Sequence, residues 1–247
     1  MKIIPFLSTI VLAALCALQP TTARAAEKVR LLIVSGGHGF DTNEFFQLFK
    51  DNPEVTVVAA THPAAHTLLR PASAANFDVL VLYDMWQKID DEGKADFVNF
   101  LKSGKGMIAL HHSIANYQDW PEYAKIVGGR YYLRPTLVDG VEKARSIWKH
   151  DVEVPVRIAD AKHPVTSGLK DFVIHDETYG LFDMLPGSHA LLTTEEPNSA
   201  KNIAWVKTYG DARVMYLQLG HDKKAYANPN FRQLVAQAIR WAAKKEN

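Results

Sequence analysis

The sequence predicts an α/β protein with a flavodoxin-like, doubly wound and mostly parallel sheet, carrying a strand- and loop-rich insertion on its rim. Three observations support this fold class. Short runs rich in β-branched residues alternate with segments of helical spacing, as in βαβ units. The runs are apolar almost throughout, which is typical of strands that helices cover on both faces. Several of them end in glycine or polar residues, at the positions where open parallel sheets bind ligands.

The first half of the chain supplies four expected strands and two expected helices. Residues 29–34 form the first strand because they are rich in β-branched residues and lead into a Gly-Gly turn before His38. A helix capped by Asp41 or Thr42 follows, with phenylalanines spaced to face the sheet. The nearly continuous apolar run at 77–84 indicates a buried strand. The other elements expected here are strands at 55–60 and 107–110 and a helix at 90–103.

The segment from about 130 to 200 has a different pattern. It contains alternating polar and apolar residues and few stretches of helical spacing, so we expect it to form the insertion. The α/β pattern then returns and ends in a helix at 231–243. The strands expected in this part are 190–194, 203–206 and 213–219. Because no internal repeat or low-complexity linker is present, we expect residues 26–247 to form a single domain.

The N-terminus has the pattern of a cleavable signal peptide. Lys2 precedes an apolar stretch that is too short for a transmembrane helix, and the triplet Ala-Arg-Ala at 23–25 provides a cleavage site after Ala25. We therefore expect residues 1–25 to be removed and the protein to be periplasmic or secreted. The single cysteine, Cys16, lies in this segment, so the mature chain has no disulfide and no thiol nucleophile.

The charge of the chain restricts the class of partner. The formal net charge is +1, and no stripe of lysine or arginine stands out. Nucleic acid and, after signal cleavage, a membrane surface are therefore not expected as partners. We expect a small neutral or weakly charged ligand and no nucleotide cofactor. A homo-oligomer is compatible with the sequence.

Polar residues, most of them histidines, follow the expected strands at the edge where ligands bind. His38 follows the first strand, Asp84 the third, His111 and His112 the fourth, and His221 a late strand. Because the carboxyl ends of parallel strands meet at one edge, we expect these side chains to lie close together. Side chains alternate along a strand, so we expect only one of the two adjacent histidines to face the site.

Three kinds of chemistry could use these histidines. Imidazoles exchange protons near neutral pH. Three of them, or two with a carboxylate, hold a divalent metal with an open position. They also bind sugar hydroxyls without catalysis. No metal-binding motif of fixed spacing is present, so the residues alone leave these alternatives open.

Two further features add candidate residues. In the segment 175–179, alternation places Asp176 on one face and Glu177 and Tyr179 on the other, so one carboxylate can point into the site while its neighbour is solvated. Trp86 follows the third expected strand, where its ring could stack on a pyranose or simply pack against the protein.

Four segments span nearly all of the mature chain in a fixed order. They are LLIVSGGHGFD at 31–41, GKGMIALHHS at 104–113, HPVTSGL with DETYGLF between 163 and 182, and WVKTYGDARVMYLQLGHD at 205–222. Together they resemble the ThuA-like family, named for trehalose utilisation, within the class I glutamine-amidotransferase-like superfold. Each segment is short, but the ordered set is specific.

The resemblance implies a flavodoxin-like sheet with a site at its carboxyl edge. True amidotransferases carry a cysteine nucleophile at the strand-to-helix elbow and a histidine after a late strand, and here His111 and His221 stand at those places. Without a mature cysteine, glutamine hydrolysis by a thiolate is excluded, and Ser113 is a poor substitute. The resemblance favours His111 over His112 as the residue that faces the site.

The resemblance also implies a substrate class. ThuA-like genes are associated with oxidoreductases that make 3-keto sugars from disaccharides, which points to 3-keto-glycosides. A keto group at carbon 3 acidifies the C2–H bond, so a base could remove that proton and the protonated glycosidic oxygen could leave. The leading hypothesis is a periplasmic enzyme acting on such glycosides by lyase, isomerase or hydrolase chemistry. The alternatives are a non-catalytic sugar-binding protein and a metal-dependent hydrolase of another small substrate.

The leading hypothesis assigns roles to individual residues. His111, His221 and Glu177 are the expected catalytic residues, with His111 as the central base or metal ligand. Together with His38 they form the expected ligand set of a divalent metal, zinc or manganese. The expected substrate contacts are His38, Asp84, Trp86, His112 and Tyr179.

Overall fold

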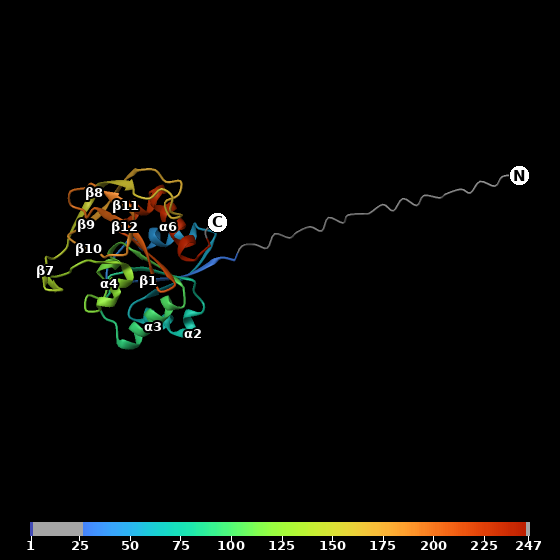
Figure 1. Cartoon of the computed structure of the whole chain (residues 1–247), viewed down its shortest axis with the longest axis horizontal. Coiled ribbons are helices and arrows are strands. Elements are labelled where there is room, and N and C mark those ends of the chain that lie inside the picture. The colour runs from blue at the N-terminus through green and yellow to red at the C-terminus, as the bar shows by residue number, and fades with distance from the viewer. Residues whose placement is uncertain (2–26, 246–247) are drawn as a thin grey trace.

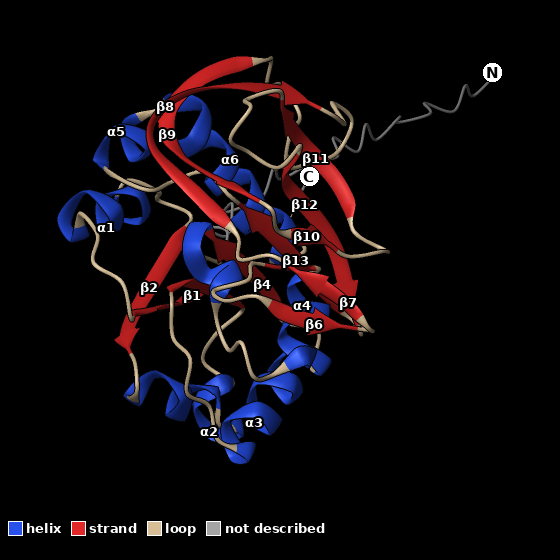
Figure 2. Ribbon diagram, turned by 90° about the vertical axis from the view of Figure 1, so that its left-hand side faces the viewer, coloured by secondary structure: helices blue, strands red, loops and turns tan. Residues whose placement is uncertain are grey.

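The computed structural model describes Met1 and residues 27–245, which form a nine-stranded mixed sheet covered by helices on both faces (Figures 1 and 2). The strand order is β2-β1-β3-β4-β13-β12-β11-β8-β9. The predicted α/β fold class is therefore confirmed. The expected signal peptide lies, apart from Met1, outside the described residues. No helix within residues 27–245 is long and apolar enough to cross a membrane.

The parallel half of the sheet carries the strand ends at which ligands are expected. Its strands are β1 (Val29–Gly36), β2 (Val55–Thr61), β3 (Val79–Asp84), β4 (Gly106–Leu110) and β13 (Ala212–Leu217). All neighbouring pairs from β2 to β13 run parallel. All six residues of β3 are buried, because helices cover both of its faces. The sequence predicted these five strands to within about two residues at most ends.

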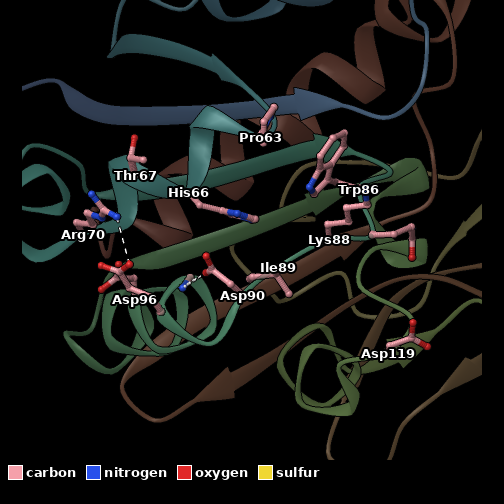
Figure 3. A pocket seen from close by; sticks show the side chains of 13 residues that line it. Pro63, His66, Thr67, Arg70, Trp86, Lys88, Ile89, Asp90, Asp96 and Asp119 are labelled. Carbon is pink, nitrogen blue, oxygen red and sulfur yellow. Dashed lines mark hydrogen bonds and ion pairs between the residues drawn. The ribbon is translucent and has the colours of Figure 1, made fainter.

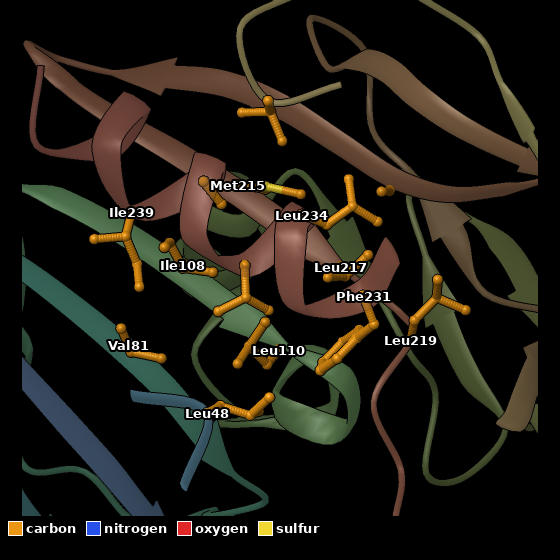
Figure 4. Packing of buried hydrophobic residues seen from close by; sticks show 14 of the residues in the cluster. Leu48, Val81, Ile108, Leu110, Met215, Leu217, Leu219, Phe231, Leu234 and Ile239 are labelled. Carbon is orange, nitrogen blue, oxygen red and sulfur yellow. The ribbon is translucent and has the colours of Figure 1, made fainter. Parts of the chain in front are cut away.

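Helices pack on the two faces of this half as two groups. They are α1 (Thr42–Lys50), η1 (Ala64–Leu69), α2 (Pro71–Ala74), α3 (Asp91–Lys102), η2 (His111–Ala115), α4 (Pro121–Val127), α5 (Lys223–Ala227) and α6 (Pro229–Ala242). Residues of α1, α5 and α6 belong to one hydrophobic cluster, and those of α2, α3 and α4 to the other. In Figure 4, Leu234 and Ile239 of α6 lie over Ile108 and Leu217 of the sheet.

Capping explains where the longer helices begin. The Asp90 side chain accepts a hydrogen bond from the backbone N–H of Gly93, which fixes the start of α3. The Asn228 side chain caps α6 in the same way, and Pro229 stands at its first position, where a missing N–H costs nothing. The last helix therefore starts two residues earlier than the sequence suggested.

The antiparallel half continues the same sheet beyond β13. Its strands are β8 (Ile147–Ile158), β9 (Phe172–Gly180), β11 (His189–Thr194) and β12 (Asn202–Tyr209), and each neighbouring pair is antiparallel. Two small ladders lie outside it: β5 (Gly129–Arg130) with β10 (Asp183–Met184), and β6 (Thr136–Val138) with β7 (Val141–Lys143). The segment expected on the rim thus supplies three strands that extend one edge of the main sheet.

Candidate functional site

The candidate site lies at the carboxyl edge of the parallel strands, where β4 ends in His111. This residue has a φ of 49°, in the left-handed region that few non-glycine residues occupy. The sharp turn ends the strand, starts η2 and buries His111 completely. Backbone strain of this kind is common at functional sites, so the elbow supports the assignment of His111 to the site.

Hydrogen bonds fix the tautomer of His111, and burial keeps its ring neutral. Its Nδ1 lies 2.5 Å from the carbonyl oxygen of Gln218, which can only accept, so Nδ1 carries the proton. Nε2 therefore accepts, and the Tyr179 hydroxyl donates to it at 2.7 Å. Burial holds the pKa of His111 well below its ordinary value, so the ring is neutral near pH 7.

His221 and Glu177 complete the cluster. His221 Nδ1 lies 3.1 Å from His111 Nε2 and 2.9 Å from Glu177 Oε2. Burial alone would lower the pKa of His221, but the hydrogen bond to the Glu177 carboxylate and its negative charge raise it above the ordinary value. The two neighbouring imidazoles thus have pKa values displaced in opposite directions, which is the arrangement of a base and an acid.

Asp176 holds the turn that carries His221. Its carboxylate accepts the backbone N–H groups of Glu177, Gly220 and His221 at 2.7–2.9 Å. Burial raises the pKa of this carboxyl to about 7, although these donors favour the charged form. Gly220 has a φ of 106°, and a Cβ there would lie 2.6 Å from the ring of Phe231, so the turn requires glycine.

A cavity of about 230 Å³ opens beside the cluster. It is lined by His38, Met85, His112, Ala115, Tyr131, Leu133, Arg145, Trp148, His150, Glu177 and Tyr179. His111 and His221 are not among the lining residues. They contact Tyr179 and Glu177 of the cavity wall from behind. A ligand in this cavity would therefore meet the phenol and the carboxylate directly, and the two histidines through them.

His112 is a buried residue of the cavity wall whose ring nitrogens are poorly satisfied. It is 3% exposed, and neither ring nitrogen makes a hydrogen bond of good geometry, although the backbone of Tyr83 lies near enough to favour the charged form of the ring. Its ring packs 4.5 Å from the rings of His38 and Tyr83, and burial lowers its pKa to about 3. Buried polar atoms are nearly always paired, so an imidazole without a well-formed hydrogen bond in a cavity wall indicates a place for a ligand. Both adjacent histidines thus reach the site region, because the elbow at His111 breaks the strand alternation.

Three side chains converge in a way that suits a metal ion. The ligand atoms of His111, Glu177 and His221 all lie within 4.8 Å of one another. Two imidazoles and a carboxylate are a donor set that binds divalent transition metals and leaves positions open. His38 lies outside this group: its Nδ1 bonds to the Gly39 carbonyl at 2.7 Å, and its ring centre is 6.3 Å from that of His221.

Asp84 and Trp86 do not join the cluster. The Asp84 carboxylate is fully buried, 2.7 Å from both His62 Nε2 and Asn116 Nδ2. Trp86 stacks on His62 at 5.1 Å and lines a separate groove, in which His66 also lies (Figure 3). His62 is the buried partner of Asp84. The position of Asp84 and Trp86 at the end of β3 indicated the correct edge of the sheet. It did not indicate on which side of the loop after β3 each side chain lies.

The structure adds residues that sequence reasoning did not select. His150 Nδ1 lies 2.7 Å from Glu177 Oε2, because a bulge in β8, with Asp151 at a φ of 55°, turns its ring toward the site. Trp148, Tyr131 and Arg145 also line the cavity. The alternating pattern of β8 predicted a strand, but nothing in it marked the bulge.

Fold and site together define an α/β protein with a glutamine-amidotransferase-like fold, in which a histidine occupies the turn after β4. A glutamine amidotransferase of Thermotoga maritima shares the fold, with a TM-score of 0.52 at 12% identity over 88% of this chain and 99% of that one. More specifically, the chain belongs to the ThuA family, described as trehalose utilisation, whose model matches residues 30–242. No curated protein matches the chain.

Two solved ThuA-like proteins have the same fold. The protein of Parabacteroides merdae superposes with a TM-score of 0.75 at 18% identity, over 89% of this chain and 91% of that one. The protein of Bacteroides uniformis gives 0.69 at 19% identity, over 91% and 95%. The chain therefore shares both the fold of these two proteins and membership of a family described as trehalose utilisation.

Proposed function

We propose that this protein is an enzyme that acts on 3-keto-glycosides or related disaccharides at the cavity beside His111. The proposal is carried by one observation: the ligand atoms of His111, Glu177 and His221 lie within 4.8 Å of one another at the wall of a cavity, to which Glu177 belongs. The cavity volume of about 230 Å³ lies below the range of about 300–1,000 Å³ for pockets of drug-sized ligands, which favours one sugar ring over a larger group.

The side chains support a proton-transfer reaction. Tyr179 lines the cavity and already donates its hydroxyl proton to His111 Nε2. Its oxygen can therefore take the C2 proton of a 3-keto sugar while its own proton passes to the neutral His111. The proton for the departing glycosidic oxygen can come from His221, whose pKa Glu177 raises, through the Glu177 carboxylate that lines the cavity. The C2–H bond and the glycosidic bond then break, a C1–C2 double bond forms, and the aglycone leaves as an alcohol.

The same three residues could hold a divalent metal, zinc or manganese. Such an ion would act as a Lewis acid toward the keto oxygen and stabilise an enediolate. His111 Nε2 has one lone pair, so metal ligation and the hydrogen bond from Tyr179 exclude each other. Elemental analysis of the untagged protein therefore distinguishes a metal-binding site from one in which Tyr179 donates to His111. Near-stoichiometric metal would favour the metal-binding form.

Other lining residues are suited to bind the sugar. Trp148 is 53% exposed at the cavity, where its ring can stack on a pyranose face. His112 lies in the wall of the cavity, with the ring of His38 packed against it. Tyr131 and Arg145 add donors to the wall. A wall that offers both donors and acceptors matches a ligand with several hydroxyl groups.

The decisive experiment is turnover of a 3-keto-disaccharide by the mature protein and by three variants. We expect His111→Ala, His221→Ala and Tyr179→Phe each to lower kcat by about 10² or more, as loss of a proton-transfer group does. His189→Ala is the matched control, since this histidine is exposed and pairs with Asp160 away from the cavity. Unchanged turnover in both histidine variants would refute the assignment.

The same assay separates the two alternative functions. Saturable binding of unmodified disaccharides without any product would identify a sugar-binding protein, the alternative that the exposed ring of Trp148 favours. Faster turnover of esters or amides than of keto-sugars would identify a hydrolase of another small substrate.

We also propose that the protein is exported after cleavage near Ala25. The pattern of residues 1–25 supports this proposal. Mass spectrometry of the protein from a periplasmic fraction tests it: the expected N-terminus is Ala26, and an intact Met1 on a cytoplasmic protein would contradict it.

A further inference from the structure

A second, larger cavity lies on the other side of the loop that follows β3. This groove has a volume of about 780 Å³ and runs between η1, the segment 86–90 and the N-terminal half of α3. Figure 3 shows His66 and Arg70 on one bank, Asp90 and Asp96 on the other, and Trp86 at one end. Met85 lines the first cavity and the adjacent Trp86 lines the groove, so the two cavities share one wall.

A buried polar network lies behind Trp86, outside the residues that line the groove. Asp84 accepts from His62 and from Asn116 at 2.7 Å, and the Asn116 side-chain oxygen accepts the backbone N–H of Trp86 at 2.8 Å. The side chains of the His62–Asp84 pair are 1% and 0% exposed. Such a paired network fixes the ring of Trp86 against His62, so this end of the groove is preorganised.

Two groups that line the groove have no partner within residues 27–245. The Asp96 side chain belongs to a residue that is only 8% exposed, yet it makes no hydrogen bond or ion pair with any described residue. The indole Nε1 of Trp86 is buried and also unpaired. Asp96 is an acceptor whose oxygens face the groove, and the buried indole N–H of Trp86 is a donor without an acceptor in the folded protein. A ligand that offers both kinds of group would satisfy both.

The charges of the lining restrict the class of ligand. Four carboxylates, those of Asp90, Glu92, Asp96 and Asp119, stand against two cations, Arg70 and Lys88. Burial lowers the pKa of His66, so this ring adds no positive charge near neutral pH. An anion would be repelled by the carboxylates. A simple cation would leave the indole N–H and Lys88 without acceptors, whereas hydroxyl groups both donate and accept.

We propose that this groove is a second carbohydrate-binding site, in which Asp96 accepts from and Trp86 donates to the hydroxyl groups of a neutral sugar. The site is distinct from the cavity beside His111 and does not depend on the reaction proposed there. It would hold either a separate saccharide or a remote unit of a longer one.

The experiment is a titration with trehalose and, separately, maltose, followed by the indole N–H signals of the ¹⁵N-labelled mature protein. The sequence has five tryptophans, and Trp86→Phe identifies the signal of interest. We expect a saturable shift of this signal. Asp96→Asn should weaken binding by about tenfold or more, as loss of a hydrogen bond to a charged group does. Asp91→Asn is the matched control, since Asp91 is on the same helix but 97% exposed and outside the groove.

A further variant separates this site from the first one. His111→Ala should abolish turnover and leave the Trp86 titration unchanged, so the two proposals can fail independently. If circular dichroism shows that Asp96→Asn does not fold, Lys88→Gln replaces it in the experiment. Lys88 also lines the groove, so we expect this variant to bind the sugar more weakly as well. Three results would overturn the proposal: no shift with either sugar, a shift that spermidine but no sugar produces, or equal affinities for Asp96→Asn and Asp91→Asn.

Discussion

Replacement of Asp176 by alanine should be among the most damaging single changes outside the apolar core. Asp176 is 2% exposed and accepts three backbone N–H groups, those of Glu177, Gly220 and His221. Alanine leaves all three donors without this acceptor. The donors belong to the turn after β13 and to β9, so the loss loosens the contact between the two elements that place His221 and Glu177.

The expected loss follows from these three bonds. An unsatisfied buried N–H group costs about 1–3 kcal/mol. Water that enters the vacated space can serve one or two of the donors, so we expect the free energy of unfolding of Asp176→Ala to fall by about 3–5 kcal/mol. Asp176→Asn keeps an acceptor oxygen and turns its amide N–H toward the remaining donors, and should lose about 1–3 kcal/mol.

Urea unfolding followed by tryptophan fluorescence measures these losses. Midpoint and slope should be reported together, because a changed slope would indicate that the unfolding is no longer two-state. Asp171→Ala is the control: Asp171 accepts one backbone N–H, from Ile158, and pairs with Arg157 at an exposed site, so its loss should stay below about 1 kcal/mol. If Asp176→Ala loses no more than this control, Asp176 does not anchor the turn.

Four further predictions concern single residues of the site and of the turn after β13. Tyr179→Phe should leave KM and the free energy of unfolding nearly unchanged while kcat falls. Trp148→Ala should raise KM by about tenfold without loss of stability, because the side chain is half exposed; a change in kcat alone would contradict stacking. His112→Leu should be about as stable as the wild type at pH 7, since no hydrogen bond of good geometry is lost, but should bind sugar poorly in calorimetry. Gly220→Ala should destabilise the protein by about 1–3 kcal/mol through strain and the clash with Phe231, measured by urea unfolding.

The pKa of His112 gives a prediction for the acid side of the stability curve. The folded protein holds this ring neutral down to about pH 3, while the unfolded chain binds a proton near the ordinary value of 6.5. The stabilisation is therefore present above pH 6.5 and is lost as the pH falls toward 3, at up to about 1.4 kcal/mol per pH unit. Unfolding measured at pH 7 and pH 5 should show a smaller loss for His112→Leu than for the wild type. Equal losses would show that His112 does not carry this proton uptake.

The parallel half of the fold was predictable because its signals are local. Continuous apolar runs, such as that of β3, reveal strands covered on both faces, and a Gly-Gly turn places His38 after the first of them. Because ligands bind at the carboxyl ends of the strands in open parallel sheets, the sequence then predicted that His38, His111 and His221 lie near one another. These inferences need no knowledge of which strands pair.

The antiparallel half was not predictable in the same way, because pairing between distant segments decides it. The pattern of residues 147–158 predicted a strand but not its bulge, which brings His150 to Glu177. The alternation of side chains along the strand likewise predicted that only one of Asp176 and Glu177 is buried. Both residues are buried, because Asp176 packs against the turn after β13 and Glu177 lies in the wall of the cavity.

The site draws its residues from both halves of the sheet, and those halves are joined by one strand pairing, that of β13 with β12. His38, His111 and His221 follow strands of the parallel half, whereas Glu177, Tyr179 and His150 belong to β9 and β8. A chimera that kept the first set and exchanged β8 and β9 for the corresponding strands of a relative would retain the imidazoles of His38, His111 and His221 and replace the acid, the phenol and the ring of His150. Because the antiparallel strands lie between β4 and β13 in the chain, such an exchange of substrate preference needs two junctions, one before β8 and one no later than the turn between β12 and β13.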